Sequence, residues 1–193
     1  MSVDRQAHTP DRIAELLVHL GRAARAGEGR CDLTQAQWGC LRFVARANAS
    51  TRTPSGFAAY QATTRGTASQ IIKSLERRGL ICRAPSATDR RSVVFDLTEA
   101  GQAMLAHDPM HDIVGLIRRI EPAESRRFLR TLSHLVVALA GLRAAPPFGS
   151  CTDCNHFSPM PGGGYCGCMA AVMAAEETTR LCASFDPAQP LET

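Results

Sequence analysis

One stretch, Ser55 to Thr98, constrains the fold of this 193-residue chain more than any other part. Within it, apolar side chains recur at the i, i+3, i+4 and i+7 spacing of one helical face, at Ala68, Ile71, Ile72 and Leu75. Gly79 follows this helix and supplies the left-handed residue with which helices commonly end. A shorter helix is predicted over residues 55–62, with Thr63 and Thr64 in the turn between the two helices. Either threonine can cap the second helix through its hydroxyl oxygen.

Two β-rich segments follow this pair of helices. The first begins at Leu80 and Ile81, the second is Val93–Leu97, and the basic loop Arg83–Ser92 separates them. Residues of this kind favour strands, and two short strands around a cationic tip form a β-ribbon. Placed directly after a helix-turn-helix, such a ribbon is a wing. The stretch therefore predicts a winged helix-turn-helix.

The polar face of the second helix carries side chains suited to nucleic acid. They are cationic, amide and hydroxyl groups, with only Glu76 acidic nearby: Arg65, Thr67, Ser69, Gln70, Lys73 and Arg77. Such groups can hydrogen-bond base edges and neutralise phosphates. The free N–H groups at the start of the helix, beside Thr64, could also hold a phosphate. The residues predicted to contact double-stranded DNA on this helix are Thr64, Arg65, Thr67, Ser69, Gln70 and Lys73.

Two runs of residues carry a resemblance to a known family. One is Ser-Leu-Glu-Arg-Arg-Gly-Leu-Ile, Ser74–Ile81, parts of which occur in many winged helices. The more specific one is Asp-Arg-Arg-Ser, Asp89–Ser92, followed by Leu-Thr-Glu-Ala-Gly at Leu97–Gly101. Over roughly residues 10–143, the length of one domain, the chain resembles the MarR family of winged-helix transcription factors.

This resemblance implies roles for the wing and for the outer helices. An arginine of the wing, Arg90 or Arg91, is expected to reach into the minor groove of DNA, with Asp89 orienting it. The first helix, predicted from Thr9 through Arg25, is expected to join the last two helices in a dimerisation bundle.

The residues after the wing predict two further apolar helical segments. Pro109 interrupts or kinks the first, and Pro122 opens the second. The second has a wide apolar stripe of Phe128, Leu132, Leu135, Val136, Leu139 and Leu142. The stripe could form the core of a monomer or the seam of a dimer. We favour a homodimer, because a winged helix needs a symmetric mate to bind a palindromic operator.

The predicted fold class is therefore mainly α with a small β wing. A winged helix-turn-helix and a helical dimerisation bundle are expected over residues 1–143, and a C-terminal metal-binding tail over residues 144–193.

The tail holds five of the eight cysteines, namely Cys151, Cys154, Cys166, Cys168 and Cys182. The Cys-x-x-Cys pair places two thiolates on one turn, and the glycines at 162–164 let the backbone approach closely. Three interpretations are open. A [4Fe–4S] cluster needs four thiolates and suits the unequal spacing and small or apolar neighbours, so we favour it. A structural zinc site could use His156 in place of one thiolate, and a metal-free thiol switch would oxidise cysteine pairs.

The tail is also similar to that of MarR-like regulators that end in Cys-x-x-Cys-x-His-Phe, then Cys-Gly, then Cys, for which a cluster is the implied cofactor. The residue after Cys-Gly is typically apolar in those tails, which makes Cys168 the extra cysteine here. The ligands that the resemblance implies are Cys151, Cys154, Cys166 and Cys182, with Cys168 as the alternative or as a redox partner.

The remaining expectations are local. Thr34 and Gln37 form a capping box that begins a helix. Side chains expected to face the interior are Trp38, Cys40, Tyr60 and Cys82, although Trp38 could instead line an effector pocket. A short helix is predicted over roughly residues 169–181, ending at Cys182.

Composition and charge bound the class of protein. The chain is 45% hydrophobic with a net charge of +4, Met1–Pro10 lacks the apolar segment of an export signal, and no run of about 18 apolar residues occurs. We therefore expect a cytoplasmic protein with no membrane partner, whose cysteines serve as metal ligands, redox groups or buried apolar residues instead of structural disulfides.

No enzymatic activity is expected. A thiol oxidoreductase that used Cys151 and Cys154 would need a thioredoxin-like βαβ context, which this sequence does not predict. A hydrolytic metalloenzyme would need an open coordination site and a general base, and His156 is the one nearby histidine.

The resulting hypothesis is a homodimeric, sequence-specific DNA-binding transcriptional regulator whose DNA binding a [4Fe–4S] cluster modulates. The cluster would sense redox state, oxygen, nitric oxide or iron status, and its loss could change the spacing of the two recognition helices. The alternative is a zinc-stapled MarR-type regulator that responds to a small-molecule effector between the helix-turn-helix and the bundle.

Overall fold

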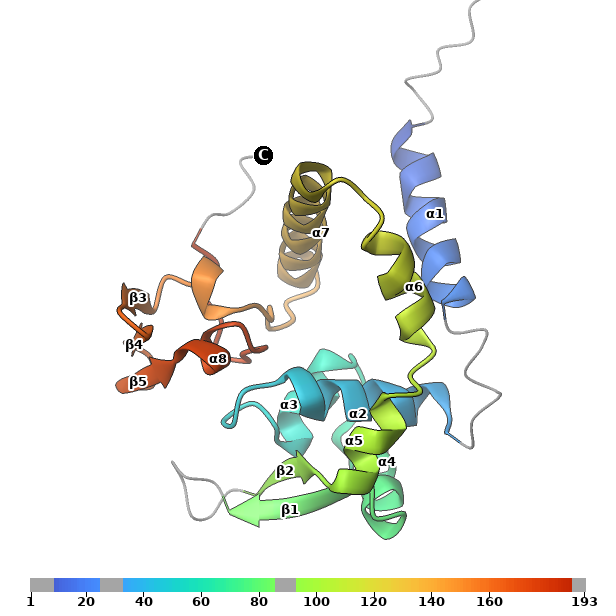
Figure 1. Cartoon of the computed structure of the whole chain (residues 1–193), viewed down its shortest axis with the longest axis vertical. Coiled ribbons are helices and arrows are strands. Elements are labelled where there is room, and N and C mark those ends of the chain that lie inside the picture. Colours follow the sequence, from blue (N-terminus) through green and yellow to red (C-terminus); the bar gives the residue numbers. More distant parts are fainter. Residues whose placement is uncertain (1–8, 25–32, 86–92, 189–193) are drawn as a thin grey trace, which may run out of the picture.

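The computed structural model describes residues 9–24, 33–85 and 93–188. Its first part consists of α1 (Thr9–Ala23), α2 (Gln35–Arg46), α3 (Pro54–Tyr60), α4 (Arg65–Arg77), β1 (Ile81–Pro85), β2 (Val93–Leu97), α5 (Glu99–Leu105), α6 (Met110–Ile117) and α7 (Pro122–Leu142). The tail consists of a 3₁₀ turn (Cys151–Asp153), β3 (Phe157–Met160), β4 (Gly163–Cys166), β5 (Ala171–Ala174) and α8 (Ala175–Thr178). Figure 1 shows the arrangement of these elements.

The winged helix has one apolar core, to which α2, α3, α4 and the two strands contribute. The largest side chains buried in it are Trp38, Leu41, Phe43, Phe57, Leu75 and Ile81. The predicted helical face of α4 is confirmed, because Ala68, Ile72 and Leu75 are buried. The predicted capping box of α2 is also present, with Thr34 and Gln37 each bonding the other's backbone N–H.

The two wing strands pair antiparallel, from Ile81 opposite Leu97 to Pro85 opposite Val93. Gly79 joins α4 to β1 in the left-handed region at φ +68°, which glycine adopts without steric cost. Gly101 in α5 lies so close to the Leu80 carbonyl that an added Cβ would be 2.0 Å from its oxygen. These two glycines let the chain reverse after α4 and let α5 pack against the base of the ribbon.

The helices α1, α6 and α7 lie away from the wing strands (Figure 1). The structure describes every residue of these three helices, and none of them is buried. Their apolar side chains face solvent in the single chain, including Ile13, Leu16, Leu116, Leu129, Val136 and Leu139. None of the described helices is long and apolar enough to cross a membrane.

An ion pair joins the junction of α5 and α6 to α2. Arg42 donates to both carboxylate oxygens of Asp108, at 2.8 Å from Nε and 2.6 Å from Nη2. The Met110 N–H donates to Asp108 Oδ1 at 2.8 Å. Burial of Asp108 would raise the pKa of its carboxyl, but the hydrogen bonds from Arg42 and Met110 outweigh burial, and the pKa is lowered.

Replacing Asp108 by asparagine is expected to lower the free energy of unfolding by about 2 kcal/mol at neutral pH, because charge-assisted hydrogen bonds are lost. A carboxyl whose pKa is lower in the folded state stabilises the fold above its unfolded pKa of about 3.9. That contribution is lost as the pH falls through the folded pKa. Urea unfolding of both proteins, from neutral pH downwards, should show the difference between them closing. A difference that stays constant at every pH would contradict this assignment.

The tail differs from the sequence prediction. Instead of a helix over residues 169–181, the chain forms strand β5 and the short helix α8. In the resulting antiparallel sheet β4 is central, with Phe157 and Ala171 both opposite Cys166. Pairing with β4 overrides the helical propensity of the alanine-rich segment, and Ala170 takes a left-handed conformation, at φ +48°, just before β5. The fold thus contains a second sheet besides the wing.

Two side-chain expectations also fail. Cys82 is exposed, because successive side chains of a strand point to opposite faces and Ile81, the residue before it, is the buried residue of β1. Tyr60 is 43% exposed and lies at the edge of the core, with ring centroids 5.3 Å from Phe43 and 5.4 Å from Phe148. Cys40 is buried as predicted, and burial raises the pKa of its thiol to about 12.

Candidate DNA interface and cysteine site

The polar face of α4 is open to solvent. Thr64, Arg65, Thr67, Gln70 and Lys73 are exposed, whereas Ser69 is half-buried. The Thr64 hydroxyl caps the helix by accepting from the Thr67 N–H at 3.1 Å, which distinguishes Thr64 from Thr63 as the cap. The face therefore presents cationic, amide and hydroxyl groups along the helix from its N-terminal cap to Lys73.

Contacts on both sides fix α4 in place. Gln37 in α2 donates to the Ser74 hydroxyl at 2.9 Å. On the other side Arg83 in β1 donates from Nε to Glu76 Oε1 at 2.7 Å. The one acidic residue near the polar face is thus neutralised by an arginine of the wing strand. The predicted wing residues Asp89, Arg90 and Arg91 lie outside the described residues.

The structure brings four cysteines of the tail together from three separate segments. Cys151 begins the 3₁₀ turn, and the Cys154 N–H donates to its carbonyl at 3.2 Å. Cys166 ends β4. Cys182 follows α8, and its N–H donates to the carbonyl of Gly149, just before the turn, at 2.9 Å. Cys151, Cys166 and Cys182 are buried, and Cys154 is half-buried.

The pKa values of two of these thiols are raised, in part by the other cysteines of the set. Burial raises the pKa of Cys151, and the nearby thiols of Cys182, Cys166 and Cys154 raise it further. Burial also raises the pKa of Cys182, hydrogen bonds from Ser184 and Asn48 oppose this rise, and Cys154 and Cys166 add to it. Cys168 is exposed and contributes to neither shift.

Hydrogen-bond donors also point at the sulfurs. The Asp186 N–H donates to Cys154 Sγ at 3.5 Å, and Cys182 has the bonds from Ser184 and Asn48. Among residues 9–24, 33–85 and 93–188, however, no three His, Cys, Asp or Glu side chains form a group that could hold a metal ion. The four thiols thus influence one another's pKa, but in this arrangement they do not form a coordination site for a single metal ion.

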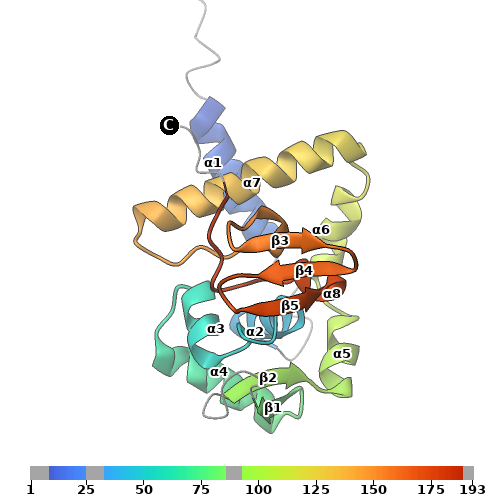
Figure 2. The same cartoon turned by 90° about the vertical axis from the view of Figure 1, so that its left-hand side faces the viewer.

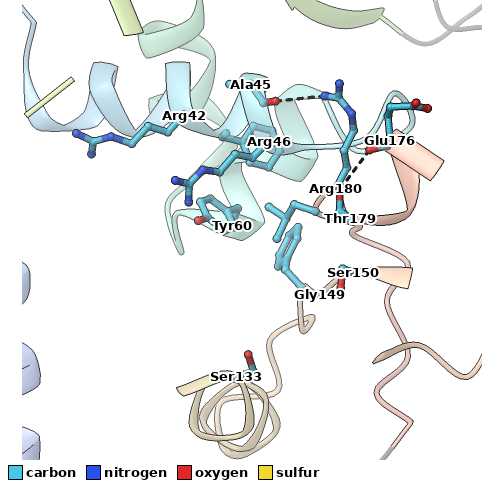
Figure 3. Close-up of a pocket in the computed structure, with 13 residues that line it drawn as sticks. Arg42, Ala45, Arg46, Tyr60, Ser133, Gly149, Ser150, Glu176, Thr179 and Arg180 are labelled. Atoms are coloured by element: carbon cyan, nitrogen blue, oxygen red, sulfur yellow. Dashed lines mark hydrogen bonds between the residues drawn. The ribbon is translucent and has the colours of Figure 1, made fainter. Parts of the chain in front are cut away.

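The tail packs directly on the winged helix. Leu181 and Ala47 form a parallel bridge, in which the Leu181 N–H donates to the Arg46 carbonyl at 2.9 Å. Next to it, Arg180 donates to the Ala45 carbonyl at 3.2 Å, as Figure 3 shows. Figure 2 shows the tail sheet in front of α2, between α7 and the wing strands.

An open pocket of about 630 Å³ lies where α2, α7, the linker and the tail meet. Arg42, Arg46, Tyr60, Glu176 and Arg180 line it (Figure 3), so its walls carry an aromatic ring and charged groups of both signs. This location agrees with the predicted place of an effector pocket, and a small-molecule effector stays a prediction.

Sequence reasoning missed the residues on which the tail docks. Asn48 and Thr51 are polar and buried, and both bond to the segment that contains Cys182. In sequence they belong to a turn-rich connection, and no local pattern marks them as partners of a segment about 130 residues away.

Comparison with known proteins shows which proteins the chain is similar to. Residues 32–92 match the sequence model of the MarR family. One similar solved structure is the complex of Staphylococcus aureus MepR with DNA, which is 20% identical, with a TM-score of 0.53 over 69% of this chain and 99% of that chain. Another is Streptococcus pneumoniae FabT in complex with DNA, which is 24% identical, with a TM-score of 0.51 over 68% of this chain and 98% of that chain. A MarR family protein from Bacillus stearothermophilus is 17% identical, with a TM-score of 0.52 over 72% and 99%. No curated protein has a detectably similar sequence.

The family model matches residues 32–92, and the similar structures share their winged-helix fold with this chain. The predicted winged helix-turn-helix is confirmed at this level.

Proposed function

We propose that the protein is a homodimeric, DNA-binding transcriptional regulator whose DNA affinity depends on a [4Fe–4S] cluster held by Cys151, Cys154, Cys166 and Cys182. The observation that carries the proposal is that the tail gathers these four cysteines and packs them against the winged helix itself. Redox state, oxygen, nitric oxide or iron status would then be the signal.

The DNA-binding part rests on α4. Its polar face is exposed, its position is fixed by α2 and β1, and its acidic neighbour Glu76 is paired with Arg83. Side chains of these types can contact both phosphates and base edges in the major groove. The similar structures of MepR and FabT were determined with DNA, which supports the same use of the fold here.

The homodimer rests on α1, α6 and α7. Three amphipathic helices whose apolar residues face solvent in one chain require a partner to cover them, and α7 alone exposes Phe128, Leu129, Leu135, Val136, Leu139 and Leu142. A second copy of the chain would cover these faces symmetrically and place two copies of α4 for a palindromic operator.

The cysteine site fits an iron–sulfur cluster by its donor chemistry. Four thiols converge, three of them are shielded from solvent, and N–H groups donate to two of the sulfurs, which are features that tune such clusters. A zinc ion needs its ligands within about 2.3 Å of one point, whereas a cluster takes one thiolate per iron and accepts a wider spacing. When bound, the cluster would supply a redox- and oxygen-sensitive centre.

Purification without oxygen tests the cofactor. We expect a broad visible absorption near 400 nm and about four iron and four sulfide per chain. About one zinc per chain with no visible absorption would instead support the zinc-stapled regulator and move the sensing role to the pocket beside Arg46 and Arg180.

A further inference from the structure

Asn48 connects the winged helix to the cysteine site. It lies in the loop between α2 and α3 and is 2% exposed. Its backbone N–H donates to the Leu181 carbonyl at 2.9 Å. Its side-chain oxygen accepts from the Thr51 N–H at 2.9 Å and from the Ser50 hydroxyl at 3.0 Å. Because the oxygen is used in this way, the amide NH₂ is the group that donates to the Cys182 sulfur.

A second polar residue of the same loop reinforces this contact. The Thr51 hydroxyl accepts from the Ala183 N–H at 2.9 Å, so the loop bonds to the residues on both sides of Cys182. The loop contacts are hydrogen bonds of buried groups, and unmaking them without replacement is costly. The loop and the Cys182 segment are therefore expected to move together.

The other end of the loop holds the DNA-binding elements. The Arg52 carbonyl accepts from the Phe95 N–H of β2 at 2.9 Å, and the Arg52 guanidinium pairs with Asp96. Thr53 caps α3 by accepting from the Gly56 N–H at 3.0 Å. Within six residues, the chain thus runs from a partner of Cys182 to a wing strand and to the first helix of the helix-turn-helix.

We propose that Asn48 is a positioning residue of the cysteine site, supplied by the winged helix, and that it couples occupancy of this site to the placement of β2 and α3. This inference rests on the proposed function. Hydrogen bonds to ligand sulfurs are among the features that set the potential and stability of a cluster. Such coupling is reciprocal. If the hydrogen bond from Asn48 stabilises the bound cluster, the bound cluster equally stabilises the loop position in which this hydrogen bond is made.

Two variants remove the donor in different ways. Asn48→Asp keeps an oxygen for Thr51 and Ser50 but places a carboxylate where the amide NH₂ faces Cys182. Asn48→Ala removes the donor without adding a charge, and it carries the test if the aspartate variant does not fold. Ser50→Ala is the matched control, because it removes a neighbour of Asn48 in the same loop and leaves the contact with Cys182 in place.

The measurements are the midpoint potential of the cluster, the rate of iron loss to a chelator and the ratio of DNA affinities with and without the cluster. Both Asn48 variants should have a more negative potential, lose iron about 10- to 100-fold faster and show an affinity ratio close to one. The Ser50 variant should match the unmodified protein in all three.

Asn48 variants that hold the cluster with unchanged potential and unchanged affinity ratio would overturn the inference, even if their thermal stability fell. An unmodified protein with no iron and sulfide, or with equal DNA affinity in both forms, would instead overturn the proposed function and the coupling with it.

Discussion

Replacing Cys166 by serine is expected to remove nearly all iron and sulfide from the protein, whereas replacing Cys168 should leave both at the content of the unmodified protein. The two residues are neighbours at the end of β4, but Cys166 is buried and affects the charge of Cys151, while Cys168 is exposed. The Cys166 substitution leaves one iron of the cluster without its thiolate, because metal ligands must be deprotonated and a serine hydroxyl does not ionise at neutral pH.

The pair controls for local disruption, because both substitutions replace cysteine by serine and lie two residues apart, Cys166 at the end of β4 and Cys168 in the turn that follows. Iron and sulfide are assayed after purification without oxygen, together with the visible spectrum. Equal loss in the two variants, or loss in the Cys168 variant alone, would show that the ligand set proposed here is wrong.

Replacing Arg65 and Lys73 together by alanine is expected to weaken DNA binding by about 100-fold at moderate salt. Both side chains lie on the exposed polar face of α4. If each neutralises one phosphate, the slope of log affinity against log salt should decrease in magnitude by about two.

Arg46→Ala is the control for loss of positive charge. Arg46 is also an exposed arginine of the winged helix, but it lines the pocket beside the tail. We expect its substitution to leave the salt slope unchanged. An Arg65 and Lys73 double variant with the same slope as the unmodified protein would show that α4 does not contact the DNA backbone.

Sequence periodicity was sufficient to predict the winged helix. The apolar spacing in α4 has one structural solution, because Ala68, Ile72 and Leu75 can be buried together only on one face of a helix. The stop at Gly79 is likewise a local effect and is found as predicted. Of the two threonines that could cap the helix, Thr64 does so.

The tail shows where local reasoning fails. The segment 169–181 is rich in alanine, and its intrinsic preference is helical, but Ala171–Ala174 pairs with β4 through backbone bonds that only the folded tail supplies. The prediction that Cys82 is buried failed for a related reason. Successive side chains of a strand point to opposite faces, and in β1 the neighbouring Ile81 is the one that faces the core. The four cysteines that the resemblance implies as ligands influence one another's pKa in the structure, and their role as ligands stays a prediction.

The structure also suggests a different route for the proposed coupling between the cysteine site and DNA binding. From the sequence, the tail could act on DNA binding through α7, the predicted dimerisation helix that precedes it. The bonds of Leu181 and Ala183 to the α2–α3 loop give a shorter route within one chain. No sequence pattern indicates this route, because Asn48 and Thr51 acquire their role only when the tail folds back onto the loop.

The most direct test of the account is a DNA titration of the protein with and without its cluster. DNA ligands would be selected from a random-sequence pool with each form separately, so that neither sign of regulation is assumed, and affinities would be measured by fluorescence anisotropy at one salt concentration without oxygen. The account predicts affinities that differ by about 5- to 150-fold, the usual range of allosteric coupling, with the Cys166→Ser protein behaving as the cluster-free form. Equal affinities for every selected DNA would contradict it.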